Sequence, residues 1–348
     1  MASPADSQLP PIVILTPGRV GDIVTSEPIF RRAHEAEPQR SVIMVTLPAY
    51  AEIMRFCPYI DEIRTVGDKA ALLQAAAEFP PGTRFIHINL PGIPLPPFGD
   101  CREPLPQPGL FDQTHNLLHT FQHENGLKPT DDTARFYLSG REKPDGLPEN
   151  YAVFHCVSGG KNRQWPRENW ARLAQHCMDA GLPVVEIGFG ATLNLTGPNY
   201  ISRCDGRLLD EIARIILHAK ALVGVESGML HIANALDTFG ILVTGTLRDM
   251  PEYNLYCGRY YNKENCNFLR FYDRNAYDLP YAVAETVIDR FLSGKPLSFE
   301  ECEAFCLKEQ IRRLQQSPWH RLCDALASPV RKLRQTLQFH KRPPRRNS

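Results

Sequence analysis

The chain has 348 residues, which is more than one ordinary α/β core requires and is enough for two. Apolar residues make up 43% and charged residues 22%, so the composition is that of a globular protein and excludes a disordered one. The formal net charge is zero, from 39 basic and 39 acidic residues, so we expect no nucleic-acid partner.

Neither a targeting segment nor a membrane span is expected. The N-terminus has no basic region, and the first apolar run, Ile12 to Leu15, is too short for a signal peptide. No apolar run approaches the length that crosses a bilayer. We therefore expect a cytoplasmic protein. Its ten scattered cysteines form no C-x-x-C pair and are expected to be buried as small apolar residues.

The first part of the chain alternates β-rich runs with helical patterns. The expected strands are Ile12–Leu15, Val42–Val45, Ile63–Val66 and Phe85–Asn89, and the expected helices are Glu27–Ala36, Ala49–Phe56 and Lys69–Phe79. Such alternation predicts a parallel sheet with helices on both faces. A proline-rich stretch over 91–108 then excludes regular structure, and a long irregular loop of this kind is more often functional than idle.

A linker over 141–148 precedes a second alternating part. The expected strands are Tyr151–Cys156, Val184–Ile187, Leu222–Val225 and Ile241–Thr244, and the expected helices are Pro166–Ala180, Leu208–Ala219, Leu230–Leu236 and Tyr281–Leu292. The pattern predicts domains at 1–143 and 144–293, with a helical, basic extension over 294–348. Two such domains favour a ligand site between them.

Three strand-to-helix turns carry candidate chemistry. Thr16 to Ile23 reads T-P-G-R-V-G-D-I, in which Asp22 is the only carboxylate; it could act as a base or cap the following helix. Ser158 to Pro166 reads S-G-G-K-N-R-Q-W-P and sets two cations beside two glycines. That combination suits a diphosphate, although a solvated basic loop is the alternative.

The third turn joins a strand to a helix at Glu226-Ser227-Gly228. The N-terminus of that helix offers free N–H donors to an anion, and the Glu226 carboxylate could accept hydrogen bonds from sugar hydroxyls. His231 lies one turn into the helix, where a lone histidine is more often structural than catalytic.

Together the three turns resemble glycosyltransferase family 9, the heptosyltransferases and their relatives. Gly21-Asp22 with Pro28 is similar to the family's G-D-x-x-x-x-x-P motif, and Ser158 to Pro166 resembles its phosphate loop. The stretch from Glu226 to Ala235 resembles its D-S/T-G-x-x-H-x-x-x-A motif, and Gly245-Thr246 resembles the next glycine-containing loop. The likeness runs in order over roughly residues 11–292, which is more specific than any single motif.

The resemblance implies a GT-B fold, two facing Rossmann-like domains, and an inverting transferase that needs neither a metal nor a cofactor. It implies that the first domain binds the acceptor and the second a nucleotide-sugar, with ADP-heptose as one candidate donor and lipopolysaccharide, another glycan or a lipid-linked sugar as the acceptor. Asp22 would be the catalytic base. The donor-binding residues would be Lys161, Arg163, Glu226, Ser227, Gly228, His231 and Thr246, and the acceptor-side residues Gly18, Arg19 and Gly21.

The chain departs from the family pattern at three places. Arg163 stands where the family usually has Lys, and Glu226 where it usually has Asp; both keep the charge. No acidic residue follows the strand Val184–Ile187, where the family tends to have one. These departures leave the sugar open. A nucleotide-sugar epimerase, which can share this two-domain fold, is the enzyme alternative. The two substituted positions also keep open a degenerate relative that binds a nucleotide-sugar or glycan without turnover.

Four further patterns are weighed against structural interpretations. Gly188-x-Gly190 lacks the third glycine of a dinucleotide fingerprint. His115, His119 and His123 recur every four residues, and we favour a polar, acceptor-facing stripe over a metal site. Cys302 and Cys306, with Cys257 and Cys266 upstream, match no zinc spacing, which favours a structural role.

The basic C-terminal tail forms the last pattern. Val330, Leu333 and Leu337 fall on one helical face, with Arg331, Lys332 and Arg334 beside it. Such a segment suits contact with an anionic membrane and would place the enzyme at the periphery of the inner membrane, whereas the alternative is a solvated terminus.

Overall fold

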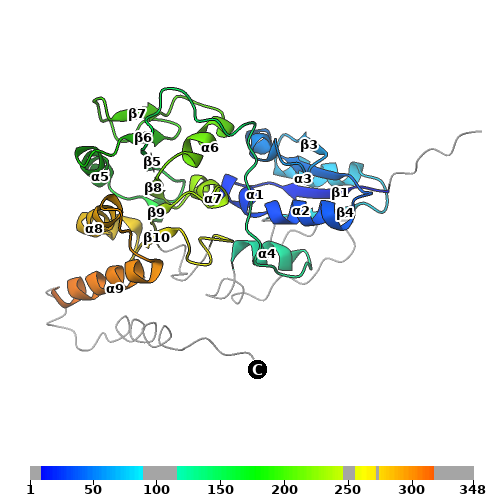
Figure 1. Ribbon diagram of the computed structural model, residues 1–348. Helices are drawn as coiled ribbons and strands as arrows, with labels where there is room; N and C mark the ends of the chain where they lie inside the picture. Colours follow the sequence, from blue (N-terminus) through cyan, green and yellow to red (C-terminus); the bar gives the residue numbers. More distant parts are fainter. Residues whose placement is uncertain (1–8, 89–115, 246–254, 272–273, 317–348) are drawn as a thin grey trace, which may run out of the picture.

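Two parallel sheets stand side by side in the computed structural model, which describes residues 9–88, 116–245, 255–271 and 274–316 (Figure 1). The first sheet has the strand order β3-β2-β1-β4. Its strands are β1 (Ile12–Thr16), β2 (Val42–Thr46), β3 (Glu62–Thr65) and β4 (Arg84–His87). Every residue of β1 and β2 is buried, because helices cover both faces of a parallel sheet. The predicted strands of this half are confirmed.

The helices of the first half differ from expectation in two places. They are α1 (Val20–Thr25), α2 (Glu27–Ala36), the 3₁₀ helix η1 (Pro48–Met54), α3 (Lys69–Ala75), the 3₁₀ helix η2 (Ala76–Glu78) and α4 (Leu117–Glu124). The short helix α1 was not predicted, and the helix expected over 49–56 is the 3₁₀ helix η1. Side chains cap two of these helices: Asp68 accepts from Ala71 N, and Asn116 accepts from His119 N.

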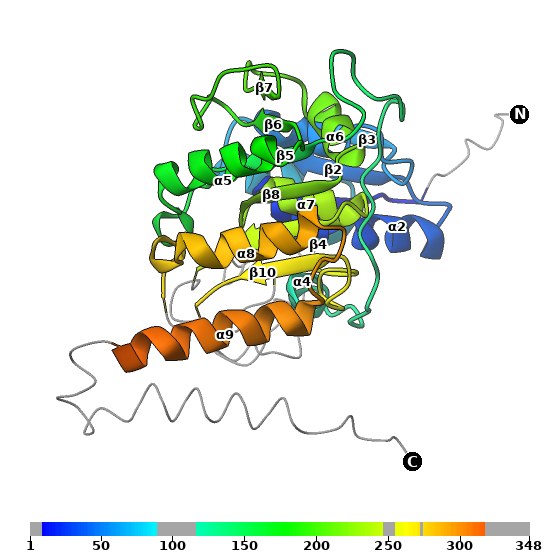
Figure 2. The ribbon, with the colours of Figure 1, turned by 60° about the vertical axis from the view of Figure 1, so that its left-hand side comes forward.

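The second sheet has the order β10-β9-β8-β5-β6-β7 (Figure 2). Its strands are β5 (Ala152–His155), β6 (Val184–Ile187), β7 (Tyr200–Arg203), β8 (Ala221–Val225), β9 (Gly240–Val243) and β10 (Cys266–Leu269). The helices are η3 (Lys161–Arg163), α5 (Arg167–Asp179), α6 (Leu209–Leu217), α7 (Gly228–Ala235), η4 (Ala276–Asp278), α8 (Tyr281–Leu292) and α9 (Phe299–Gln316). The two edge strands, β7 (Y-I-S-R) and β10 (C-N-F-L), were not predicted.

The helix α9 is the described part of the expected C-terminal extension. It packs along β10 through Phe299, Cys302 and Cys306, which are buried, and Arg270 forms an ion pair with Glu303 at 2.6 Å. No helix of the described residues combines the length and the hydropathy that a membrane span requires. The proline-rich stretch 91–108 and the basic tail 328–348 lie outside the described residues.

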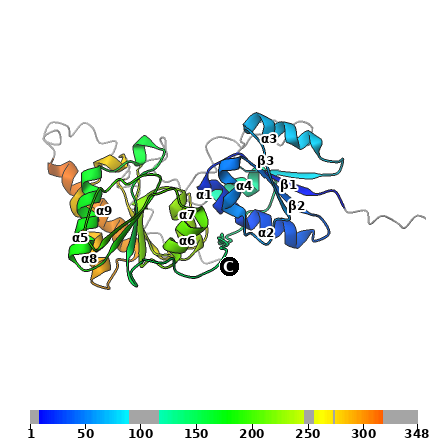
Figure 3. The same ribbon diagram turned by 90° about the horizontal axis from the view of Figure 1, so that it is seen from above.

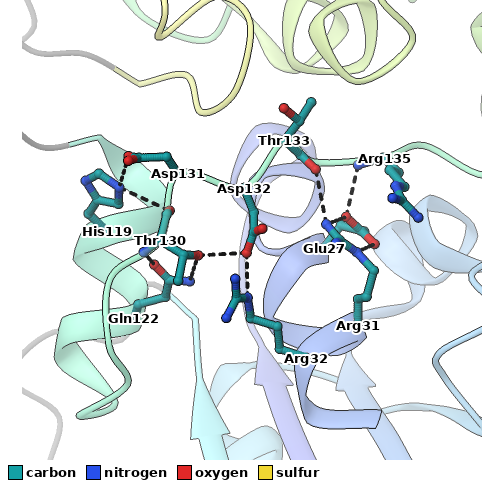
Figure 4. A network of polar contacts seen from close by, with 10 residues as sticks. All are labelled: Glu27, Arg31, Arg32, His119, Gln122, Thr130, Asp131, Asp132, Thr133 and Arg135. Atoms are coloured by element: carbon teal, nitrogen blue, oxygen red, sulfur yellow. Dashed lines mark hydrogen bonds and ion pairs between the residues drawn. The ribbon is translucent and has the colours of Figure 1, made fainter. Parts of the chain in front are cut away.

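The connection between the two sheets is fixed to the first sheet at one end. The carboxylate of Glu27, fully buried in α2, accepts hydrogen bonds from Arg31, from the Arg135 backbone N–H at 3.0 Å and from the Tyr137 hydroxyl at 2.8 Å. Figure 4 shows the bonds of Glu27 with Arg31 and with the Arg135 N–H, together with the Arg32–Asp132 ion pair at 2.5 Å.

The following residues of the connection are fixed to the second sheet instead. Ser139 donates to Asp210 of α6 through both its backbone N–H, at 2.9 Å, and its hydroxyl, at 2.7 Å. Further along, His218 Nε2 lies 2.7 Å from Arg141 O, and Arg203 donates to Asp145 O at 3.0 Å. The bonds to Glu27 thus end at Tyr137 and those to Asp210 begin at Ser139, although Thr133 also lies against Gly258 of the second half.

Helices α1 and α7 form the contact between the two halves (Figure 3). A Cβ atom added to Gly21 would lie 2.7 Å from His231 Cδ2, and one added to Gly228 would lie 2.5 Å from Val20 Cβ. His231 Nδ1 lies 2.9 Å from Thr25 Oγ1 across this contact. The apolar cluster that contains Ile23 and Val24 of α1 also contains Leu230 and Ile232 of α7, so the core is continuous through the contact.

The burial of His231 predicts an acid-sensitive fold. Burial, assisted by the nearby Arg163 charge, lowers the pKa of His231 to about 3. The unfolded chain therefore binds a proton below about pH 6.5 that the folded chain refuses, and folding stability falls on acidification by roughly 1.4 kcal/mol per pH unit over that window. Urea unfolding at pH 7 and pH 4.5 should show a larger loss for the wild type than for His231→Phe. Equal losses would contradict a buried neutral His231.

Candidate functional site

The three sequence-predicted turns of the second half meet at one edge of its sheet. All six strands are parallel, so the turns after β5, β8 and β9 lie at the same carboxyl edge. The chain runs outward from β5 through β6 to β7, and then continues on the other side of β5 with β8, β9 and β10. Ligands of open α/β sheets bind at such a switch in strand order, here between β5 and β8.

Arg163 and Glu226 join the turns that follow these two strands. Arg163 Nη1 forms an ion pair with Glu226 Oε2, and the same nitrogen lies 3.4 Å from Glu226 O. The side chains are 16% and 8% exposed, so the pair is largely shielded from water. Burial raises the pKa of the Glu226 carboxyl, and the Arg163 charge opposes that rise. The two candidate donor-binding residues are thus brought together, and each neutralises the other.

Two polar atoms beside this pair have no hydrogen-bond partner among the described residues. They are the Arg163 Nε–H and the Ser227 hydroxyl oxygen, both buried. Ser227 is the N-cap of α7, yet its side chain makes no capping bond. Buried polar atoms are normally paired, and unpaired ones need an explanation such as an absent ligand. The N-terminus of α7 adds a partial positive charge at the same place.

Asp22 lies across the interdomain contact from this pair. It is the third residue of α1, whose N-cap is Arg19, so Asp22 occupies the first helical turn and not the capping position. Its side chain is partly buried, and its negative charge contributes to the raised pKa of Glu226. Arg19 is exposed and acts on Glu226 in the opposite sense, while Gly18 is buried. The acceptor-side residues and the donor-side turn therefore share one electrostatic environment.

The other predicted donor-site residues are distributed differently. His231 is 4% exposed and packs against Gly21, Thr25 and the Tyr256 ring, so the structure places it in the interdomain contact. A Cβ atom added to Gly245 would clash with Asn162 O and with Ala276 N. The glycine therefore lets the phosphate loop pack closely against η4. Thr246 and the side chain of Lys161 lie outside the described part of the chain.

The histidine and cysteine series do not form metal sites in the described residues. There, no three His, Cys, Asp or Glu side chains gather closely enough to hold a metal ion. The expected shared stripe is wrong for two of its members, because His123 is exposed whereas His119 is buried with Nε2 3.1 Å from Thr130 O. His115 lies outside the described residues. The cysteine thiols of α9 are buried against Phe268 O, as a structural role predicts.

Sequence reasoning missed the structural use of Glu186. This carboxylate, 1% exposed within β6, accepts from the Thr192 and Leu193 backbone N–H groups at 2.5 and 3.0 Å and from the Tyr200 hydroxyl at 2.5 Å. It fixes the turn 188–193 that follows the strand. A lone Glu inside an apolar strand was the available signal, since buried carboxylates occur where several donors converge.

Comparison with known proteins shows a likeness to one family over part of the chain. The model of Glycosyltransferase family 9 (heptosyltransferase) matches residues 112–245. Lipopolysaccharide heptosyltransferase 1 of Salmonella typhimurium is 29% identical over 106 residues, 28% of this chain and 33% of that protein. The enzyme of the same name from Escherichia coli K12 is 29% identical over 102 residues, 27% and 32% of the two chains. The matched region thus spans about a third of the length of these curated relatives.

Solved structures agree over most of the chain. E. coli heptosyltransferase WaaC with ADP superimposes with a TM-score of 0.60 at 16% identity, covering 80% of this chain and 99% of that one. A glycosyl transferase family 9 protein of Veillonella parvula gives 0.59 at 15% identity, covering 89% and 97%. E. coli ADP-heptose lps heptosyltransferase II gives 0.56 at 16% identity, covering 86% and 99%.

The structural likeness confirms the GT-B fold that the motifs predicted. The family model matches residues 112–245, which include the phosphate loop and the Glu226 motif. The chain is therefore similar to glycosyltransferase family 9 over residues 112–245 and has the GT-B fold of the solved heptosyltransferases.

Proposed function

We propose that this protein is an inverting glycosyltransferase, which moves a sugar, a heptose or a related one, from a nucleoside-diphosphate donor to a hydroxyl group of a glycan acceptor. One observation carries the proposal: the turn that bears Asp22 contacts the turn that bears Glu226, Ser227 and Gly228. A base on one domain is thereby set beside a candidate anion site on the other. The fold alone would allow many activities, so the argument rests on this juxtaposition.

The proposed step has two charge requirements. As the acceptor oxygen bonds to the anomeric carbon, its proton passes to Asp22, which acts as the general base. The bond from that carbon to the diphosphate oxygen breaks, and the leaving nucleoside diphosphate takes the electron pair. Arg163, Ser227 and the N-terminus of α7 would stabilise the new charge. These groups supply the role that a metal has in other transferases.

The identities of the substrates are part of the same proposal. Two neighbours in the comparison are described with ADP and with ADP-2-deoxy-2-fluoro heptose, which supports a nucleotide-sugar donor with ADP-heptose as the first candidate. The curated relatives are lipopolysaccharide heptosyltransferases, which supports a lipopolysaccharide precursor or another lipid-linked glycan as acceptor. An enzyme with that acceptor would work in the cytoplasm, at the inner face of the membrane.

The first test concerns the base. Asp22→Asn keeps the side-chain shape and removes the proton acceptor, so turnover should fall by a factor of roughly 10² or more. Donor affinity, measured by calorimetry, should stay within about twofold, because the proposed donor-binding residues lie on the second domain and α1 keeps its shape. Asp61→Asn is the matched control, because Asp61 directly precedes β3, at the opposite end of the strands from Asp22. Near-full turnover of Asp22→Asn would refute the assignment.

The second test separates the anion site from folding. Arg163→Ala should weaken binding of ADP by about tenfold to a hundredfold, the usual value of a charge-assisted contact. It also strands the buried Glu226 carboxylate, so the double variant Arg163→Ala/Glu226→Gln serves as control for stability. The double variant should recover thermal stability and still bind ADP weakly. If ADP affinity returned with stability, Arg163 would have only a structural role.

The third test concerns the contact between the domains. In Gly228→Ala the new methyl group would meet Val20 Cβ at 2.5 Å, and α1 must shift away from α7. Turnover should fall at least tenfold, since displacements of an ångström at a reacting centre are costly. Gly67→Ala, where a Cβ meets nothing within 4 Å, is the matched control and should be neutral. Unchanged kcat in Gly228→Ala would show that this close approach is dispensable.

A further inference from the structure

Exposed apolar side chains follow three neighbouring strands at the carboxyl edge of the second sheet. Among the described residues, six large apolar side chains are exposed, and three of them follow adjacent strands of this sheet. They are Val157 after β5, Phe189 after β6 and Leu208 after β7, at 49%, 107% and 60% exposure. Figure 2 shows these three strands side by side. Three such residues on one stretch of edge favour a flat apolar occupant.

Phe189 is the most prominent of the three and lies on a turn that holds it in position. Glu186 fixes the turn from below through the Thr192 and Leu193 N–H groups, and His155 Nδ1 lies 3.2 Å from Ile187 O at its base. Glycines flank the ring on both sides, and Gly188 has φ of 154°. The ring is thus presented by a supported turn without neighbouring side chains at 188 or 190.

The register places Phe189 next to the phosphate loop. Phe154 pairs with Glu186, so two residues beyond each strand the chain reaches Val157 and Phe189 at the same level. Ser158 begins the phosphate loop directly after Val157. A ligand whose diphosphate lies in that loop would therefore have its next few atoms within reach of Phe189.

On the opposite side of the switch, the phosphate loop packs against the protein. The loop 161–165 crosses toward β9 and β10, where Asn162 O meets Gly245 and the Trp165 indole N–H donates to Leu279 O at 2.7 Å. The β6 side, in contrast, carries no charged side chain from Ile187 to Ser202. The cationic side of the site suits the diphosphate, and the uncharged side suits the uncharged end of the ligand.

We propose that Phe189 is the platform on which the heterocyclic base of the nucleotide donor stacks, with Val157 at its edge. The inference rests on the proposed function, and it assigns to this chain an aromatic contact for the base. An aromatic ring can stack on any nucleobase, and this contact adds to the affinity for the nucleotide without hydrogen bonds to the base. Phe189 would therefore set how strongly the base is held more than which base is chosen.

The test compares two probes that differ only in the base. Calorimetry on the full chain first finds which of ADP, GDP and UDP binds most tightly. The dissociation constant of that nucleotide is then compared with that of ribose 5-diphosphate. Phe189→Ala should weaken the nucleotide by about tenfold and leave ribose 5-diphosphate within about twofold, because only the base loses a contact. Phe189→Tyr should restore binding. Phe56→Ala, which removes an exposed Phe from the first domain, should change neither probe.

The outcomes distinguish this proposal from the proposed function. The thermal unfolding midpoint should not change in Phe189→Ala, since the ring is exposed. If the wild type prefers the nucleotide over ribose 5-diphosphate but Phe189→Ala keeps that preference, the base lies elsewhere and this proposal fails alone. If the wild type binds the nucleotide and ribose 5-diphosphate equally well, the base has no platform and the proposal also fails. If it binds none of the four probes, the proposed function fails and this proposal with it.

Discussion

The close approach of α1 to α7 is the constraint on which the arrangement of the site depends. Gly21 and Gly228 each lack the Cβ atom that would separate the two helices, and the neutral ring of His231 fills the space between them. Because the apolar core continues through this contact, the two domains share packing. The proposed base, Asp22 on α1, therefore has its position set partly by residues of the other domain.

A second consequence follows from the charge pair at the phosphate loop. Arg163 and Glu226 neutralise each other when no anion is present, so a buried guanidinium is never left without a counter-charge. A diphosphate would replace one acceptor with another and would leave Glu226 with a raised pKa, free to meet hydroxyl groups. The departure from Asp to Glu at this position gives the carboxylate one more methylene with which to reach Arg163.

Much of the architecture could be predicted from sequence because central parallel strands are continuous apolar runs. Ile12–Thr16 and Val42–Thr46 are nearly of this kind, and so are β8 and β9. The edge strands β7 and β10 were missed because each has at most two consecutive apolar residues. The helix α1 escaped because T-P-G-R-V-G-D reads as a turn, and tertiary contact with α7 makes it helical.

The candidate site shows the same division. The residue types at positions 22, 163 and 226 were found from spacing, since each follows a strand and precedes a helix. Their pairing could not be found, because the ion pair between Arg163 and Glu226 joins turns that are 63 residues apart. The places of His231 and Glu186 likewise depend on partners remote in sequence, and a single sequence carries no record of those partners.

The connection between the sheets has a mechanical consequence. Its bonds to Glu27 end at Tyr137, and its bonds to Asp210 begin at Ser139. Hydrogen bonds therefore fix successive parts of this connection to different sheets, while Thr133 also lies against Gly258 of the second half. Because the apolar core is also continuous across α1 and α7, the two halves are linked at two separate places.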